Sequence, residues 1–236
     1  MSKIGEVHGK ADTVLDALSE YMADGLLVFP THTWNQVNAK SPKFHVNETP
    51  SDVGVLSELF RQRPNVIRSL HPTHSVSALG KDALSFTSDN ERFDTAIARE
   101  SSYGKLLDRN GKILLIGVDL TVNTFIHGIE EWNNIPNRLR EYPDDLRTVL
   151  SDNTEIPVPT KRHVSYDVSK NYWKVEQLLV EKGAIEYGKF GDAKVLVCDA
   201  VKITKYISEM LTIDPDIFGN SLPLFNDFIR AFNDLT

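Results

Sequence analysis

Cysteine is almost absent from the sequence, because Cys198 is the only one. A single cysteine excludes an internal disulfide, which suits a reducing compartment. No apolar run approaches the ~20 residues that span a bilayer. Residues 1–20 lack the basic start and the apolar stretch of a signal peptide. We therefore expect a cytoplasmic protein with no membrane partner.

Basic charge is also scarce. The chain has 26 lysines and arginines against 33 acidic residues, which gives a formal net charge of −7. Nucleic acids and anionic membranes require a net basic surface or a dense basic patch. We therefore expect no nucleic-acid partner. A cationic partner fits this charge, although modest acidity also serves solubility alone.

The glycine-rich loops that cradle nucleotides are missing as well, since neither GxGxxG nor GxxxxGK[ST] occurs. The stretch Gly188 to Gly191 is typical of a hairpin turn instead. The G-x-S-x-G turn of many hydrolases is also absent. Its absence argues against a hydrolase triad of Ser75, His127 and Glu130.

The apolar fraction of 41% and the charged fraction of 25% are ordinary for a globular protein, and we expect one domain over residues 1–236. The pattern of apolar residues mixes helices and strands, which predicts an α/β fold. Helices are expected over 12–23, 55–61, 144–150, 172–182 and 201–211, strands over 26–29, 112–118, 184–187 and 193–198, and loops over 35–53 and 134–159.

The segment after the predicted strand 112–118 carries a histidine and acidic residues at helical spacing. A helix starting near Asn123 or Thr124 would place Thr124, His127 and Glu130 on one face. His127 would be a base, with Glu130 accepting a hydrogen bond from its ring. Free backbone N–H groups near Asn123 and Thr124 would stabilise an oxyanion. In the alternative, His127 packs beneath the helix and Glu130 is solvated.

A second group of polar side chains surrounds a proline-fixed turn at residues 68–75. Arg68, Ser69 and Ser75 have the charge and the hydroxyls that bind phosphorylated cofactors, while His74 would line the acceptor pocket. The hydroxyl of Ser75 is also a candidate to stabilise an oxyanion. Thr31 directly follows the strand 26–29, at the end of α/β strands where ligands bind. In the alternative, these hydroxyls and rings satisfy loop backbone groups and Arg68 pairs with an acid.

A zinc site is a further alternative, formed by His71 and His74 with His127 and Glu130. Pro72 lies between the first two histidines and disfavours the helix on which such a pair converges best. We therefore predict no metal.

The order of several short motifs resembles the aminoglycoside 3-N-acetyltransferase family over nearly the whole chain. The matching residues are Thr49-Pro50-Ser51 with Gly54, Phe60-Arg61, Arg68-Ser69, His71-Pro72, His74-Ser75, Gly80, Asn123-Thr124, His127 and Glu130, followed by Gly188, Gly191, Ala193 and Asp214-Pro215. The resemblance implies a central mixed sheet with helices on both sides, distinct from the GNAT acetyltransferases.

The same resemblance implies the activity. The expected enzyme is an acyltransferase that moves acetyl from acetyl-CoA to an amine, such as the 3-amino group of an aminoglycoside antibiotic, and thereby confers antibiotic resistance. The family's base and its acidic partner map to His127 and Glu130, and Ser2 and Lys3 map to the coenzyme A site. We expect a monomer or a homodimer.

The sequence departs from the family at two places that affect function. The family has a helix, a strand and a His-Ser-Ser segment before the part that matches Ser2 and Lys3, and we expect that this N-terminal segment is missing here. Thr121 stands where many resistance enzymes have an aspartate that contacts the antibiotic. The alternatives are therefore a non-catalytic or truncated relative and a metal-dependent hydrolase.

Overall fold

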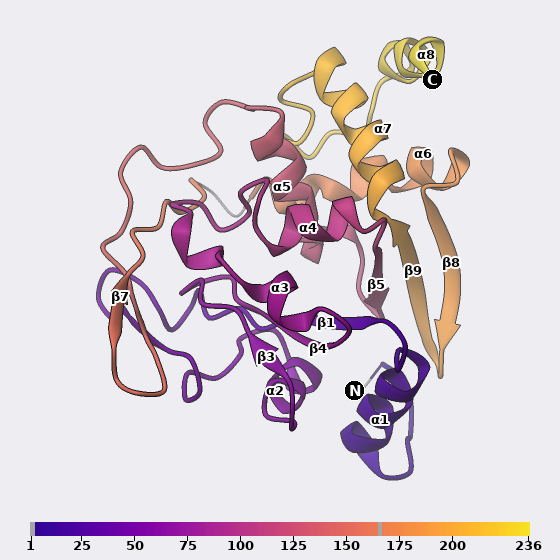
Figure 1. The fold of residues 1–236 in the computed structure, drawn as a ribbon. Coiled ribbons are helices and arrows are strands. Elements are labelled where there is room, and N and C mark those ends of the chain that lie inside the picture. The colour runs from indigo at the N-terminus through magenta and orange to yellow at the C-terminus, as the bar shows by residue number, and fades with distance from the viewer. Residues whose placement is uncertain (1–2, 165–166) are drawn as a thin grey trace. The chain divides into compact units, whose positions relative to one another are not determined.

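The computed structural model of the protein describes residues 3–164 and 167–236, which form two compact units. Unit 1 contains Glu6–Ser102 and Arg140–Arg162. Unit 2 contains Lys3–Gly5, Tyr103–Leu139 and the described part of His163–Thr236. Both units mix helices and strands, which confirms the predicted α/β class (Figure 1). A single domain over residues 1–236 stays a prediction.

Unit 1 is built on two three-stranded sheets. The first has the order β1-β4-β3 and is antiparallel, while the second has the order β2-β6-β7, with β2 and β6 parallel. The elements are α1 (Lys10–Tyr21), β1 (Leu26–Pro30), β2 (Lys43–His45), α2 (Val55–Arg61), β3 (Ile67–Arg68), β4 (Val76–Gly80), α3 (Ala83–Thr87), the 3₁₀ turn η1 (Asn90–Arg92), β6 (Arg147–Val149) and β7 (Glu155–Pro157).

Unit 2 is built on one antiparallel sheet with the order β5-β9-β8. Its elements are α4 (Ser102–Asp108), whose first residue belongs to unit 1, β5 (Lys112–Ile116), the 3₁₀ turn η2 (Leu120–Val122), α5 (Phe125–Trp132), the 3₁₀ helix η3 (Ser169–Val175), α6 (Glu176–Glu181), β8 (Ile185–Phe190), β9 (Ala193–Asp199), α7 (Ala200–Ile213) and α8 (Asn226–Leu235). By hydrogen bonding, the described strands of the chain thus form three sheets of three.

The core of unit 2 lies where α5 and α7 bury their apolar faces. Ile126 and Ile129 of α5 and Ile203 and Ile207 of α7 are fully buried, as their helical spacing requires. The core therefore fixes the orientation of α5, the helix that carries His127.

Cys198 is buried in β9, and this burial raises the pKa of its thiol to about 12.

Several predicted elements are confirmed. The helix over 55–61 is α2, the strand over 26–29 is β1, the helix over 201–211 is α7, and the hairpin around Gly191 is formed by β8 and β9. The helix predicted over 172–182 is divided, with a 3₁₀ part before α6. α6 ends at Glu181, two residues before Gly183, which has a φ of +64°.

The helix predicted over 144–150 is wrong. Residues Arg147–Val149 form β6, which pairs with β2 on one side and β7 on the other. Phe44 of β2 and Leu146 just before β6 are both fully buried, so this pairing closes a small apolar cluster. A short apolar run cannot reveal such distant pairing, and the partner strand β2 lay within the predicted loop over 35–53.

The strand predicted over 112–118 exists as β5, which is two residues shorter and buries only one of its faces. Leu115 is 7% exposed whereas its neighbour Leu114 is 48% exposed. Since β5 is the first strand of its sheet and side chains alternate between faces, only one face of β5 lies in the core.

α8 was not predicted from the sequence, and its Phe232 is fully buried. Within the described residues, no helix has both the length and the apolar content that crossing a membrane requires.

The hairpin turn between β8 and β9 depends on glycine at residue 191. Gly191 has a φ of +59°, and a Cβ there would lie 2.3 Å from the carbonyl oxygen of Ile4. The same oxygen accepts a hydrogen bond from the N–H of Asp192, so it has little freedom to move.

Gly191→Ala should lower the free energy of unfolding by at least about 1–2 kcal/mol, measured by urea denaturation. Gly188→Ala is the matched control. Its added Cβ would meet only Val195, at 4.0 Å, and it should cost less than about 0.5 kcal/mol. Equal losses for the two variants would contradict this account of the turn.

Candidate functional site

The segment that leads to His127 is fixed by local capping. The carboxylate of Asp119 accepts hydrogen bonds from the backbone N–H and the hydroxyl of Thr121, which closes the turn η2. α5 begins at Phe125, close to the predicted start. His127 and Glu130 therefore lie one helical turn apart on the same face, as predicted, with Nδ1 and Oε2 separated by 3.5 Å.

Glu130 is a buried carboxylate whose side chain is 1% exposed. Its Oε1 accepts a hydrogen bond from Nε of Arg138 at 2.6 Å, and its Oε2 accepts one from the hydroxyl of Tyr172 at 2.6 Å. Burying a charge is costly unless it is paired and hydrogen-bonded, and Glu130 meets both conditions. We call the residues His127, Glu130, Arg138 and Tyr172 the His127 cluster.

Tyr172 connects the two predicted catalytic residues. Its hydroxyl lies 2.7 Å from Nδ1 of His127 and 2.6 Å from Oε2 of Glu130. An ionised carboxylate can only accept, so the single hydroxyl proton points to Glu130. The hydroxyl oxygen must then accept from Nδ1–H of His127. This assignment leaves Nε2 of His127 with a free lone pair, which is the form that a general base requires.

The electrostatics of the His127 cluster favour an ionised Glu130. Burial raises the pKa of this carboxyl, but the neighbouring ring of His127, the hydrogen bonds from Tyr172 and Arg138 and the charge of Arg138 outweigh burial and hold the pKa below its ordinary value of 4.5. Burial, reinforced by the nearby Glu130, raises the pKa of Tyr172 well above its ordinary value. Tyr172 therefore keeps its proton and remains a donor at neutral pH.

Two aromatic rings pack against the His127 cluster. The imidazole of His163 lies 4.2 Å from that of His127, centroid to centroid, at an angle of 37°. The ring of Phe218 meets Tyr172 edge to face, with centroids 4.8 Å apart. These contacts restrict the orientation of both hydrogen-bonded rings.

Four residues of this region were not predicted as site residues from the sequence: Arg138, His163, Tyr172 and Phe218. Arg138 lay in a predicted loop and Tyr172 at the start of a predicted helix. The one available signal was the need of a buried carboxylate for a cationic or hydroxyl partner, and that signal does not identify which residue supplies it.

The backbone groups predicted to stabilise an oxyanion already have partners. The N–H of Asn123 donates to the carbonyl of Leu120 at 2.9 Å, and that of Thr124 donates to Val122 at 3.1 Å. The side chain of Asn123 is a better candidate. It is buried, and its Nδ2 has no hydrogen-bond partner within the described part of the protein.

Arg68 is buried in unit 1 and its guanidinium is extensively bonded. It donates from Nε to the hydroxyl of Ser75 and from Nη2 to the carbonyl of Thr31. Nη1 donates to the carbonyls of Val46 and Thr49. Burial, with a smaller effect of the like charge on Arg61, lowers the pKa of Arg68 to about 9. The guanidinium therefore remains charged at neutral pH and joins four segments of unit 1.

The hydroxyls predicted to bind the cofactor are also part of this polar interior. The hydroxyl of Thr31 lies 3.1 Å from that of Ser75 and 3.2 Å from that of Ser77. The hydroxyl of Ser69 accepts from the N–H of Val76 at 3.0 Å. The structure thus brings Thr31, Arg68 and Ser75 together, and each of them has protein partners.

The two histidines of the turn differ in their surroundings. Nδ1 of His71 accepts from the backbone N–H groups of Thr73 and His74 at 3.3 Å, which places its proton on Nε2. Burial, with a smaller effect of Arg162, lowers the pKa of His71 to about 3. Nδ1 of His74 lies 2.9 Å from the hydroxyl of Thr73. His71 is therefore a neutral ring within the fold.

The remaining predicted positions lie near the N-terminus. Lys3 donates from Nζ to the carbonyl of Gly117 at 2.5 Å. Ser2 lies outside the described residues. Over 3–164 and 167–236, the structure contains no group of three or more histidine, cysteine or acidic side chains suited to a metal ion.

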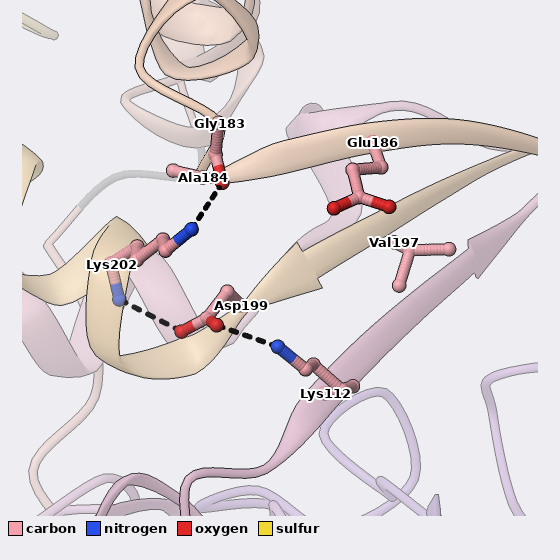
Figure 2. Close-up of a pocket in the computed structure, with 7 residues that line it drawn as sticks. All are labelled: Lys112, Gly183, Ala184, Glu186, Val197, Asp199 and Lys202. Atoms are coloured by element: carbon pink, nitrogen blue, oxygen red, sulfur yellow. Dashed lines mark hydrogen bonds and ion pairs between the residues drawn. The ribbon is translucent and has the colours of Figure 1, made fainter.

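A small pocket of about 80 Å³ lies at the end of the sheet of unit 2 (Figure 2). Nζ of Lys112 donates to Asp199 at 2.6 Å, and Nζ of Lys202 donates to the carbonyl of Gly183 at 3.0 Å. Its lysines are thus engaged with their neighbours, and none of the residues that line it belongs to the His127 cluster.

Comparison with known proteins gives one family. A sequence model described as aminoglycoside 3-N-acetyltransferase matches residues 1–212. Aminoglycoside N(3)-acetyltransferase VII of Streptomyces paromomycinus is 27% identical over 174 residues, which cover 66% of this chain and 59% of that protein. The prophage-derived acetyltransferase-like protein YokD of Bacillus subtilis is 27% identical over 224 residues, covering 82% and 76%. The chain thus spans about three fifths of the Streptomyces relative.

Solved structures agree on the fold. Aminoglycoside acetyltransferase AAC(3)-IVa superposes with a TM-score of 0.77 at 24% identity, covering 92% of this chain and 80% of that one. AAC-IIIb in a binary complex with CoASH gives 0.74 at 22% identity, covering 86% and 84%. These likenesses confirm the predicted fold class.

Replacing the carboxylate of Glu130 tests the charge pairing of the His127 cluster. Glu130→Gln should lower the free energy of unfolding by about 3 kcal/mol at pH 7, because it leaves the guanidinium of Arg138, whose side chain is 10% exposed, beside a neutral group in place of its shortest ion pair. The folded-state pKa of Glu130 is depressed, so its stabilisation is fully present above the unfolded value near 4.5 and is lost as the pH falls through the folded value.

The difference between wild type and Glu130→Gln should therefore shrink below about pH 4.5, as followed by urea denaturation across pH. Glu186→Gln, an exposed change of the same kind, should show no such difference. A gap for Glu130→Gln that stays constant from pH 7 to pH 4 would contradict the pairing.

Replacing Arg68 tests whether its role is structural. Arg68→Lys keeps the charge but loses the planar fork, and it should lower the free energy of unfolding by about 2–3 kcal/mol in urea denaturation. Arg92→Lys is the control, since that side chain is 74% exposed. Unchanged stability of Arg68→Lys together with weakened coenzyme A binding would instead favour direct phosphate contact.

Proposed function

The chain belongs to the aminoglycoside 3-N-acetyltransferase family, and on that basis we propose that it transfers an acetyl group from acetyl-CoA to an amine of a small molecule. The observation that carries this proposal is the hydrogen-bonded arrangement of His127, Tyr172 and Glu130. It holds one imidazole with a free nitrogen at the position where the family motif has its base. The enzyme would be an acyltransferase of EC class 2.3.1.

His127 acts as the general base in this proposal. Its Nε2 takes a proton from the accepting amine as the amine nitrogen forms a bond to the thioester carbonyl carbon. The carbon–sulfur bond then breaks, and His127 returns the proton to the departing thiolate. The imidazolium exists only between these two transfers. Protons and electron pairs balance without any further reactant.

Glu130 and Tyr172 act through His127. Tyr172 holds Nδ1–H, so the ring cannot turn its free nitrogen away from the substrate. Glu130 places a negative charge 3.5 Å from Nδ1, which stabilises the imidazolium that forms on proton transfer. Arg138 keeps Glu130 ionised and fixed in the fold. Glu130 therefore stays ionised and Tyr172 stays protonated throughout the reaction.

Stabilisation of the negative charge that develops on the carbonyl oxygen is assigned to Asn123. Its Nδ2 is a buried donor without a partner in the described chain, four residues before His127. One such donor contributes roughly 3–4 kcal/mol to transition-state stabilisation. Thr124, also predicted for this role, carries a hydroxyl at the start of α5.

The cosubstrate assignment rests on the family. Thr31, Ser69 and Ser75, with Ser2 and Lys3, are retained as candidates for coenzyme A binding. Arg68 has four hydrogen bonds within unit 1, so we assign it an indirect role, in which it holds the 46–49 loop rather than a phosphate. His74 is retained as a candidate of the acceptor pocket.

The acceptor is proposed to be a cationic small molecule, such as an aminoglycoside with its 3-amino group. A net charge of −7 is compatible with such a ligand. The name of the Streptomyces relative gives N(3) acetylation of aminoglycosides for that protein. Thr121 lacks the carboxylate that many resistance enzymes have, so amines other than aminoglycosides belong in any test.

A thiol-release assay with acetyl-CoA and a panel of amines tests the proposal. Release that depends on the amine is expected, and His127→Ala should reduce turnover by ~10²–10⁴-fold while coenzyme A affinity is nearly unchanged. His45→Ala is the control, because that ring belongs to β2 in unit 1 and has a 43% exposed side chain.

The assay also separates the alternatives. A folded protein that releases no thiol with any amine would be a non-catalytic relative. Activity that a chelator abolishes would indicate a metal-dependent hydrolase. Full activity of His127→Ala would remove His127 from the mechanism.

A further inference from the structure

The segment that follows α7 lies beside the His127 cluster. Residues 214–220, here called the strap, begin directly after α7 and two residues after the end of the family match at residue 212. The strap has no helix or strand, yet Ile217 is 1% exposed and Phe218 is fully buried. A buried loop needs partners for its backbone polar groups, and these partners come from residues next to the catalytic candidates.

One set of contacts joins the strap to Tyr172. The ring of Phe218 packs edge to face against Tyr172, with centroids 4.8 Å apart at 76°. The carbonyl of Phe218 accepts from Nδ2 of Asn171 at 2.8 Å. Nζ of Lys174 donates to the carbonyls of Ile217 at 2.5 Å and Asn220 at 3.3 Å. Residues on both sides of Tyr172 are thus fixed to the strap.

A second set of contacts joins the strap to Arg138. Nη2 of Arg138 lies 3.3 Å from Oδ1 of Asp216 and 3.5 Å from the carbonyl oxygen of Pro215. Nε of the same guanidinium donates to Glu130. The strap therefore holds one side of Arg138 while Glu130 holds the other.

Gly219 leaves room for the carboxylate of Asp216. A Cβ at residue 219 would lie 2.1 Å from Oδ2 of Asp216, so any larger residue would displace this carboxylate. The N–H of Gly219 also donates to the carbonyl of Asp216 at 2.7 Å. The local sequence of the strap thus favours the contact with Arg138.

We propose that the strap is a positioning element of the active site, in which Phe218 acts through Tyr172 and Asp216 acts through Arg138. Only the predicted effects on kcat rest on the proposed function, whereas the positioning of His127 does not. Tyr172 and Arg138 are the two donors to Glu130, so the strap contacts both groups that set the geometry of the base. Catalytic groups must be held within about 0.5 Å of their productive geometry, which requires such support.

The tautomer of His127 can be measured without any substrate, and it reports whether Tyr172 is held in position. Long-range ¹H–¹⁵N correlation NMR should find His127 protonated on Nδ1 in the wild type. Phe218→Leu should loosen Tyr172 and give a mixture of both tautomers. Phe225→Leu is the matched control, because Phe225 lies just beyond the strap and is 70% exposed. A pure Nδ1–H form in Phe218→Leu would overturn the proposal.

Kinetics separate positioning from general stability. Phe218→Leu should lower kcat by about tenfold with little change in KM. In a Tyr172→Phe background, the same change should add less than about twofold, since its effect passes through the Tyr172 hydroxyl. A full further tenfold loss in that background would show that Phe218 acts by packing alone and would overturn the proposal.

Asp216 has a 75% exposed side chain, so replacing it does not disturb the core. Asp216→Asn should lower kcat by about threefold, Asp216→Glu should restore it, and Asp227→Asn in α8 should have no effect. Equal activity of Asp216→Asn and wild type would remove Asp216 from the proposal. If no amine is acetylated but the tautomer still shifts in Phe218→Leu, then the proposed function fails while the positioning role stands.

Discussion

The buried carboxylate of Glu130 is the group on which the candidate site depends. A carboxylate with a 1% exposed side chain cannot rely on water for its hydrogen bonds, so the fold must supply donors. Arg138 and Tyr172 supply them at 2.6 Å each. Because the only hydroxyl hydrogen of Tyr172 is donated in the hydrogen bond to Glu130, the hydroxyl oxygen accepts a hydrogen bond from Nδ1–H of His127. The position of one charge thus determines the tautomer of the proposed base.

Unit 1 contains a buried charge of the opposite sign that is stabilised differently. Arg68 donates to three backbone carbonyls and one hydroxyl, rather than to a carboxylate. Such an arrangement fixes loops but leaves no ionised partner for proton chemistry. The contrast explains why we assign general base catalysis to the His127 cluster and a supporting role to Arg68.

Sequence reasoning could predict what depends on local spacing. His127 and Glu130 are three residues apart, and helical geometry alone places them on one face. Tyr172 is 42 residues from Glu130, and Phe218 is 47 residues from Asn171, so only the tertiary fold brings them together. β6 was missed for the same reason, because its strand conformation depends on pairing with β2 across more than 100 residues. The resemblance of motifs predicted the family, whereas the contacts of Arg68 required the structure.

Neutron diffraction from crystals exchanged into deuterated solvent tests the central claim most directly, because it locates the hydrogens of the His127 cluster. The account predicts deuterium on the Tyr172 hydroxyl directed at Glu130, deuterium on Nδ1 of His127 directed at Tyr172, and a bare Nε2. Deuterium on Nε2 with a bare Nδ1, or deuterium on Glu130, would contradict it.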